Sequence, residues 1–240
     1  MWSGLYSRLQ SKLSRSLRRS LAVGFFAAFA IQPAASATTL PGLVAHWTFD
    51  EGSGSSAADS SGNGYTATLF NGVGWISGRI AGAISANGTN QYASTPSINL
   101  TSTHAVTVSL WVDRTYSGTV AGSALLEFSD NYNNYQDTFG FFPEAAADCG
   151  ASAMEIGIRG NAGYNVKCFA QPSSGVWHHM AIVLDKTQAA ANQVNLYMDG
   201  VLQTALKQTY SSANTNAFGN HPLYLFSRAG SVGFSAAEMD

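Results

Sequence analysis

The chain has 240 residues, of which 45% are hydrophobic and only 11% are charged. Its 12 Lys and Arg and 14 Asp and Glu give a formal net charge of −2 at pH 7. Proteins that bind nucleic acid need a basic surface, so this composition argues against nucleic acid as a partner.

The first 37 residues have the three parts of a secretory signal peptide. Five basic residues precede an apolar run of 11 residues, Leu21–Ile31, and Ala35-Ser36-Ala37 offers the small residues of a cleavage site. The apolar run is well short of the roughly 20 residues that a membrane-spanning helix needs. We therefore expect a secreted or cell-surface protein with no membrane span in the mature chain; an uncleaved N-terminal anchor is the alternative.

Residues 38–240 would form the mature part, which is long enough for one all-β domain. It keeps 7 of the 12 Lys and Arg and all 14 Asp and Glu, a formal net charge of −7. The acidic balance strengthens the argument against nucleic acid.

Alternating apolar residues predict a series of short strands separated by turn-forming residues. In chain order the expected strands are Leu43–Phe49, Tyr65–Phe70, a hairpin across Ala83–Ala93, Val106–Val112, Ala124–Phe128, Thr138–Phe142, Met154–Ile158, Trp177–Leu184, Gln193–Met198 and Leu223–Phe226. No window of the mature chain keeps a helical period. The pattern predicts an all-β protein, an antiparallel β-sandwich or jelly roll.

Asp199-Gly200 gives the clearest hairpin signal. It follows the alternating segment 193–198 and precedes Val201-Leu202, and Asp-Gly readily adopts the positive φ angles of a two-residue turn. Together with the strand 177–184, this hairpin is expected to form the centre of one antiparallel sheet.

The two cysteines, Cys149 and Cys168, lie 19 positions apart. In an exported chain an even pair indicates a disulfide, which would contribute about 3 kcal/mol to stability in the loop-entropy model. Two reduced thiols, buried separately, are the alternative.

Five motifs in a fixed order resemble the bacterial laminin-G-like, or concanavalin A-like lectin/glucanase, family of jelly rolls. They are WTFDEGSG at 47–54, DSSGNG at 59–64, TVSLWV at 107–112, WHH at 177–179 and LYMDG at 196–200. The resemblance implies a single jelly-roll domain over residues 38–240. It also implies that FSAAEMD, residues 234–240, begins a segment that family members continue into a final strand. We therefore expect a C-terminally truncated chain that lacks this strand and leaves the first strand with an unpaired edge.

One Gly- and Ser-rich loop carries Asp50, Glu51, Asp59 and Asn63. Calcium takes six to eight oxygen ligands from carboxylates, amides and carbonyls. The resemblance implies a calcium ion near the first strand, with a late acidic residue, here Asp240, as a further ligand. We predict a structural calcium site; the alternative is that Asp59 and Asn63 form turns through their own backbone contacts.

The segment 129–142 is rich in aromatic and amide side chains. Sugar binding needs flat aromatic faces beside groups that bond hydroxyls, and this segment supplies Tyr132 and Tyr135 together with Asn131, Asn133 and Asn134, flanked by Asp130 and Gln136. We predict a ligand-binding loop here. The alternative is a solvated loop that leads into a core strand containing Phe139, Phe141 and Phe142.

The sequence argues against catalysis. Glu127 and Asp130 have an odd spacing, which puts them on opposite faces of a strand, and Glu155 has no acidic partner two or four positions on. The chain contains no G-x-S-x-G nucleophile motif. His178 and His179 face opposite sides of their strand and cannot bind a metal from one face.

These observations predict a secreted, non-catalytic module that recognises an extracellular glycan or glycoprotein, as part of a surface or adhesion protein. The first alternative is a structural protein–protein interaction module without a sugar site. The second is a glycan-cleaving enzyme of the concanavalin-like class.

Overall fold

The computed structural model describes residues 40–115, 122–131, 136–144, 148–150 and 152–240. The predicted signal peptide, residues 1–37, lies outside the described residues. Within these ranges, no helix combines the length and the apolar character that a bilayer crossing requires.

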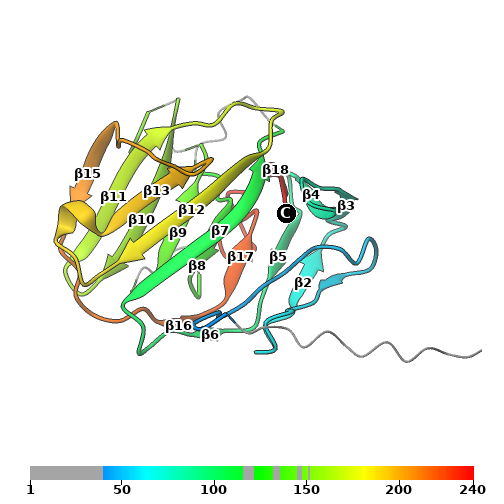
Figure 1. The fold of residues 1–240 in the computed structure, drawn as a ribbon, viewed down its shortest axis with the longest axis horizontal. Coiled ribbons are helices and arrows are strands. Elements are labelled where there is room, and N and C mark those ends of the chain that lie inside the picture. The colour runs from blue at the N-terminus through cyan, green and yellow to red at the C-terminus, as the bar shows by residue number, and fades with distance from the viewer. Residues whose placement is uncertain (1–39, 116–121, 132–135, 145–147, 151) are drawn as a thin grey trace, which may run out of the picture. The chain divides into compact units, whose positions relative to one another are not determined.

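Two antiparallel sheets provide nearly all the regular structure (Figure 1). The nine-stranded sheet contains, in spatial order, β1 (Ser56–Ala57), β2 (Ala67–Phe70), β5 (Tyr92–Ser94), β17 (Leu223–Leu225), β8 (Leu126–Phe128), β9 (Phe139–Phe142), β10 (Ala153–Gly160), β11 (Gly163–Ala170) and β15 (Lys207–Ser211). The seven-stranded sheet contains β14 (Val201–Leu202), β13 (Val194–Met198), β12 (His178–Asp185), β7 (Ala105–Asp113), β18 (Ala236–Met239), β4 (Gly82–Asn87) and β3 (Gly74–Ser77). A two-stranded sheet joins β6 (Ile98–Asn99) to β16 (Asn220–His221), and a short 3-10 helix covers Ala190–Asn192.

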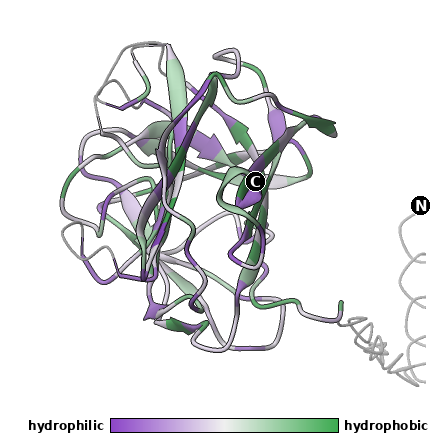
Figure 2. Cartoon of the chain, turned by 90° about the vertical axis from the view of Figure 1, so that its left-hand side faces the viewer, coloured by the Kyte–Doolittle hydropathy of each residue, from purple (hydrophilic) through white to green (hydrophobic). Residues whose placement is uncertain are grey.

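One apolar core lies between the two large sheets. On β7, Leu110 and Val112 are buried, whereas Thr107 and Ser109 on the opposite face are exposed. Hydrophobic and hydrophilic residues accordingly both occur within the strands (Figure 2), as burial of one face requires. The predicted all-β antiparallel sandwich is confirmed.

The predicted Asp-Gly hairpin is also confirmed. Asp199 and Gly200 have φ angles of +51° and +81°, and they join β13 to β14. The Asp199 carboxylate accepts a hydrogen bond from the His179 backbone N–H at 2.9 Å and contacts His178 Nδ1 at 2.7 Å. The WHH and DG motifs therefore stabilise one another across neighbouring strands.

Two strand predictions are wrong. The segment 43–49 forms only an isolated bridge, between Trp47 and Asp59. Its backbone bonds to side chains and not to a partner strand. Asp59 Oδ1 accepts from His46 N at 3.0 Å, and Asn63 Nδ2 donates to the Val44 carbonyl at 2.9 Å.

The second error concerns the hairpin expected across 83–93. β4 pairs with β3 and β18 in the seven-stranded sheet, whereas β5 pairs with β2 and β17 in the nine-stranded sheet. The Asn87-Gly88 turn therefore carries the chain from one sheet to the other. Gly88 has a φ angle of +71°, a conformation that glycine adopts without steric cost.

The FSAAEMD segment forms β18 in the middle of the seven-stranded sheet. Ala237 lies opposite Ala86 of β4, and Met239 lies opposite Val112 of β7. In Figure 1 the C label marks the end of this strand, beside β7.

Candidate functional site

The outer face of the nine-stranded sheet contains a cavity of about 260 Å³, which we call the groove. Strands β8, β9, β10, β11 and β15 and the loop after β17 contribute to it. Its polar and aromatic side chains include Glu127, Phe142, Asp148, Glu155, Arg159, Tyr164, Tyr210 and Arg228.

Strict alternation on β10 explains why charged groups gather here. Met154, Ile156 and Ile158 are buried in the core, so Glu155 and Arg159 point to the outer face. The same alternation places Glu127 outward from β8, between two core residues. The hydrophobic pattern that builds the sandwich therefore also delivers the polar lining of the groove.

Two glycines, Gly140 and Gly157, lie opposite each other in the floor of the groove. A Cβ at Gly140 would lie 2.7 Å from the Phe142 ring, and one at Gly157 would lie 3.1 Å from Val166 Cγ2. The absence of side chains at both positions allows the neighbouring groups to pack across the floor and keeps the groove open.

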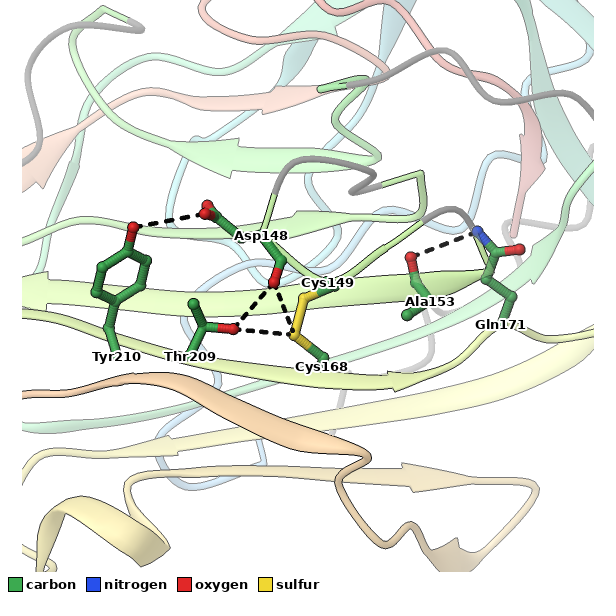
Figure 3. The surroundings of a disulfide bond; sticks show 7 residues. All are labelled: Asp148, Cys149, Ala153, Cys168, Gln171, Thr209 and Tyr210. Atoms are coloured by element: carbon green, nitrogen blue, oxygen red, sulfur yellow. Dashed lines mark hydrogen bonds between the residues drawn. A yellow bond between two sulfur atoms is a disulfide. The ribbon is translucent and has the colours of Figure 1, made fainter.

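The disulfide holds one wall of the groove. Cys149 and Cys168 are joined as predicted, with their Cα atoms 5.4 Å apart, so the segment before β10 is tied onto β11 (Figure 3). Thr209 Oγ1 donates to the Asp148 carbonyl at 3.1 Å, and Tyr210 Oη donates to Asp148 Oδ1 at 3.4 Å. This wall therefore presents a carboxylate and a tyrosine beside each other.

Arg228 holds the opposite wall. Its Nε donates to Glu127 Oε1 at 3.4 Å, and its guanidinium carbon lies 5.3 Å from the centre of the Phe142 ring. The loop that carries it contains two residues with positive φ, Phe226 at +64° and Ala229 at +49°. Glu127 Oε2 is buried and has no hydrogen-bond partner among the described residues.

Burial changes the protonation of both glutamates. It raises the pKa of Glu127, although the Arg228 charge opposes this shift. Burial, assisted by the nearby charge of Asp148, raises the pKa of Glu155 to about 7. Near neutral pH Glu155 therefore exists in both forms, so it can donate a hydrogen bond as well as accept one.

The groove thus combines aromatic rings with carboxyl and guanidinium groups. Arg159 lies against the Tyr164 ring, and Tyr210 packs at a ring-centre distance of 5.5 Å from Tyr164. Such a surface can stack on the apolar face of a ring and bond hydroxyls at its edge.

Most of the predicted ligand-binding residues, Tyr132, Asn133, Asn134 and Tyr135, lie outside the described residues. Asn131, the last described residue before them, is exposed. His221 holds the two ends of the loop together. Its Nδ1 contacts Asp130 Oδ1 at 2.8 Å, and its Nε2 contacts the Gln136 carbonyl at 3.1 Å.

The predicted calcium ligands fall into two sets. Asp59 and Asn63 hold the segment 43–46, as described above. Hydrogen bonds to Asp59 from Ser61, His46 and Tyr65 outweigh its burial and lower its pKa. Glu51 Oε1 accepts from Ala58 N at 2.6 Å. Among the described residues, no three His, Cys, Asp or Glu are grouped as a metal site would need.

The second set comprises Asp50 and Asp240, which each accept a backbone hydrogen bond at the turn between β3 and β4. Asp50 Oδ1 accepts from Gly82 N at 2.8 Å, and Asp240 Oδ2 accepts from Ile80 N at 2.5 Å. A Cβ at Gly78 would lie 2.4 Å from the Gly82 carbonyl oxygen and 2.6 Å from Asp240 Oδ2. Carboxylate and carbonyl oxygens therefore converge on this turn, which is the donor chemistry that calcium prefers.

The chain belongs to the concanavalin A-like lectin/glucanase superfamily, whose family model matches residues 87–240. The predicted family is therefore confirmed. A search of curated protein sequences found no match.

Several solved structures share the fold. The binding domain of Paraclostridial mosquitocidal protein 1 matches with a TM-score of 0.51 and 16% identity, over 77% of this chain and 44% of that one. The binding domain of botulinum neurotoxin serotype G matches with a TM-score of 0.54 and 12% identity, over 77% and 44% of the two chains. Trypanosoma rangeli sialidase in complex with sialic acid matches with a TM-score of 0.52 and 14% identity, over 79% and 28%. This chain spans less than half the length of each, and identities this low establish the fold alone.

Sequence reasoning missed the groove. A local pattern relates Glu127 and Glu155 only to acidic residues on their own strands. It gives no reason to single out Tyr164, Tyr210 or Arg228. The available signal was the alternation of MEIGIRG, residues 154–160, which sets Glu155 and Arg159 apart from the apolar positions.

Proposed function

We propose that this protein is a secreted carbohydrate-recognition module that binds an extracellular glycan in the groove, as part of a surface or adhesion protein. The observation that carries the proposal is the joint presence of tyrosines, carboxylates and arginines around a glycine floor on one sheet face. Sugar sites need this combination, because a pyranose has an apolar face and a polar edge.

Each part of the groove has a role in this proposal. Tyr210, which is exposed, offers a ring face for stacking, and Tyr164 packs beside it at a ring-centre distance of 5.5 Å. Glu155 and Asp148 bond hydroxyl groups. Because one matched structure is described as a sialidase in complex with sialic acid, sialylated glycans belong among the first probes.

The proposal includes binding without cleavage. This part rests on the sequence, in which neither Glu127 nor Glu155 has an acidic residue two or four positions away on its own strand. We expect no release of reducing sugar, and a release that Glu127→Gln abolishes would contradict this part of the proposal.

The test is a glycan array followed by titration of the strongest ligand into three sets of variants. Tyr210→Ala in the groove should weaken binding at least tenfold. Tyr197→Ala is the matched control, because this tyrosine is similarly exposed, at 38% against 43%, but lies on the other sheet. If the array is empty, or if both variants bind equally well, the groove is not the site.

The third set, Tyr132→Ala and Tyr135→Ala, tests the predicted loop. Loss of binding in these variants with Tyr210→Ala unaffected would move the site to the loop. Loss in both sets would mean that one ligand spans the groove and the loop.

A structural calcium ion near Asp50 and Asp240 is a second part of the proposal. The convergence of oxygens at the turn between β3 and β4 supports it, and Phe49 and Gly82 could add backbone carbonyls. Bound calcium would neutralise the two carboxylates and fix the turn against the end of β18.

A further inference from the structure

A lysine with a completely buried side chain, Lys186, follows β12. Its Nζ lies 4.4 Å from the centre of the Phe218 ring, 3.8 Å from Asp137 Oδ1 and 3.4 Å from the Ala217 carbonyl oxygen, to which it donates. Burial lowers the pKa of Lys186 to about 8, although the charge of Asp137 opposes this shift. More of this amine is therefore unprotonated near neutral pH than in an exposed lysine, and the unprotonated amine is the nucleophilic form.

The side-chain amide of Asn216 is held beside this amine. Asn216 lies in the loop between β15 and β16, and its Nδ2 donates to Asp137 Oδ1, the same oxygen that Lys186 Nζ approaches. Its Oδ1 accepts a hydrogen bond from the backbone N–H of Asn161 at 3.0 Å. One carboxylate oxygen therefore contacts both nitrogens, and a backbone donor lies on the amide oxygen.

A glycine at the end of β10 lets these groups converge. A Cβ at Gly160 would meet Asn216 Oδ1 and would lie 3.0 Å from Lys186 Nζ. The amine and the amide come from different loops, yet both approach this one point beside the backbone. A side chain at Gly160 would push them apart.

We propose that Lys186 and Asn216 form an isopeptide bond, an amide between the two side chains, with Asp137 as the acid–base group. Lys186 Nζ attacks Asn216 Cγ and the new C–N bond forms, while the N–H of Asn161 stabilises the negative charge that develops on Oδ1. Asp137 carries a proton from Nζ to Nδ2, the Cγ–Nδ2 bond breaks and ammonia leaves. One amide replaces another, so the step needs no co-reactant.

Two other acceptors for the amine fit less well. Asn214 is buried nearby, but its Nδ2 donates to the carbonyls of Gly163 and Ser212, which cannot supply a proton to a leaving group. Asp137 is itself an acceptor only after it is protonated, because a carboxylate anion repels a nucleophile. The Asn216 amide has a carboxylate at its leaving nitrogen, which is the arrangement that the reaction requires.

The bond would join the two sheets covalently. Lys186 follows β12 of the seven-stranded sheet, whereas Asn216 follows β15 of the nine-stranded sheet. The disulfide, by contrast, ties the segment before β10 to β11 within the nine-stranded sheet. This proposal is independent of glycan binding in the groove.

The test is peptide mass spectrometry of the full chain after reduction of the disulfide and digestion with trypsin. Trypsin cleaves after Lys and Arg, but not after a lysine whose amine is part of an amide. The segment 168–207 should therefore stay joined to 208–228. The mass of the joined pair should be about 17 Da below the sum of the two free segments, because ammonia is lost.

Two matched substitutions locate the nucleophile. Lys186→Arg and Lys207→Arg each remove one primary amine and keep both the charge and the trypsin site. Lys186→Arg should abolish the joined pair, whereas Lys207→Arg, at an exposed position of β15, should leave its yield unchanged.

A third variant covers the case in which Lys186→Arg does not fold. Asp137→Asn keeps the size of the side chain, and asparagine tolerates the positive φ angle of +59° at this position. It removes the proton carrier, so the joined fraction should fall at least tenfold.

Three results would overturn the proposal. One is complete recovery of the free segments 168–186 and 187–207 from the unmodified protein. Another is a loss of about 18 Da with 168–207 joined to 115–159, which would mean loss of water and a bond to Asp137. The third is an undiminished joined fraction in Asp137→Asn, which would remove the acid–base role of Asp137.

Discussion

The groove and the turn between β3 and β4 present their polar groups by different means. In the groove, the strands beneath are paired with their neighbours, and side chains such as Glu155 and Tyr210 line the cavity. At the turn, the carboxylates of Asp50 and Asp240 accept backbone hydrogen bonds, and the Gly82 carbonyl lies near Asp240. One sandwich therefore presents side chains on a sheet face and carboxylates beside backbone groups at a turn.

The supports of the two regions differ as well. A covalent bond, Cys149–Cys168, holds a wall of the groove. Hydrogen bonds from the backbone N–H groups of Gly82 and Ile80 hold the carboxylates of Asp50 and Asp240 at the turn. Removing one support should damage one region and spare the other.

The largest effect is expected from removal of the disulfide. Cys149→Ser combined with Cys168→Ser should lower the free energy of unfolding by about 3 kcal/mol, because the unfolded chain regains loop entropy. Glycan affinity should fall as the wall carrying Asp148 loosens, whereas the gain in stability with calcium should be unchanged. Urea unfolding, a glycan titration and thermal melts with calcium measure this; loss of both effects would show that the two regions are not independent.

A comparable effect is expected from pH, again confined to the groove. Because the pKa of Glu155 is raised to about 7, the folded state favours its protonated form. Its contribution to stability is complete below pH 4.5, declines as the pH rises and is lost above about pH 7. The decline is up to about 3 kcal/mol for a shift of this size. Glu155→Gln should flatten the profile between pH 4.5 and 7, and an unchanged profile would show that another group is responsible.

A smaller effect should distinguish the two sets of predicted calcium ligands. At a calcium concentration ten times Kd, binding should raise the free energy of unfolding by about 1.4 kcal/mol. Asp50→Asn and Asp240→Asn should each abolish this gain, whereas Asp59→Asn should keep it. Thermal melts with calcium and with a chelator test this, and no calcium shift in the unmodified protein would contradict the site.

The smallest effect is expected from Asp59→Asn. The lost charged acceptor should cost about 1 kcal/mol near neutral pH, since the site is partly solvated. The pKa of Asp59 is lowered, so its contribution is present above pH 3.8 and is lost as the pH falls further. Glycan affinity should be unchanged, because Asp59 bonds to the segment 43–46 and does not line the groove. Urea unfolding and a glycan titration measure this, and a fall in glycan affinity would contradict the assignment.

Much of the fold could be predicted because its signals are local. Alternation over residues 106–112 and the Asp199-Gly200 turn each specify their structure within a few residues. The segment 43–49 has the same apolar character, yet its backbone bonds to the side chains of Asp59 and Asn63, which a local pattern cannot reveal. The Asn87-Gly88 turn was misassigned for a related reason: a turn motif does not say whether the next strand returns to the same sheet.

The groove was harder to predict because its parts come together only through long-range pairing. Glu127 and Glu155 reach one face through the β8–β9–β10 ladder, and Arg228 follows a strand almost a hundred residues away from Glu127. Alternation could show that Glu155 faces outward, but only the strand order shows what lies beside it.

The most direct test of carbohydrate recognition is amide chemical-shift mapping with the strongest glycan from the array. The account predicts shifts at Gly140, Gly157, Tyr164 and Tyr210, with Thr107 and Ser109 on the other sheet unchanged. The absence of shifts on the face formed by β9, β10 and β11 would contradict it.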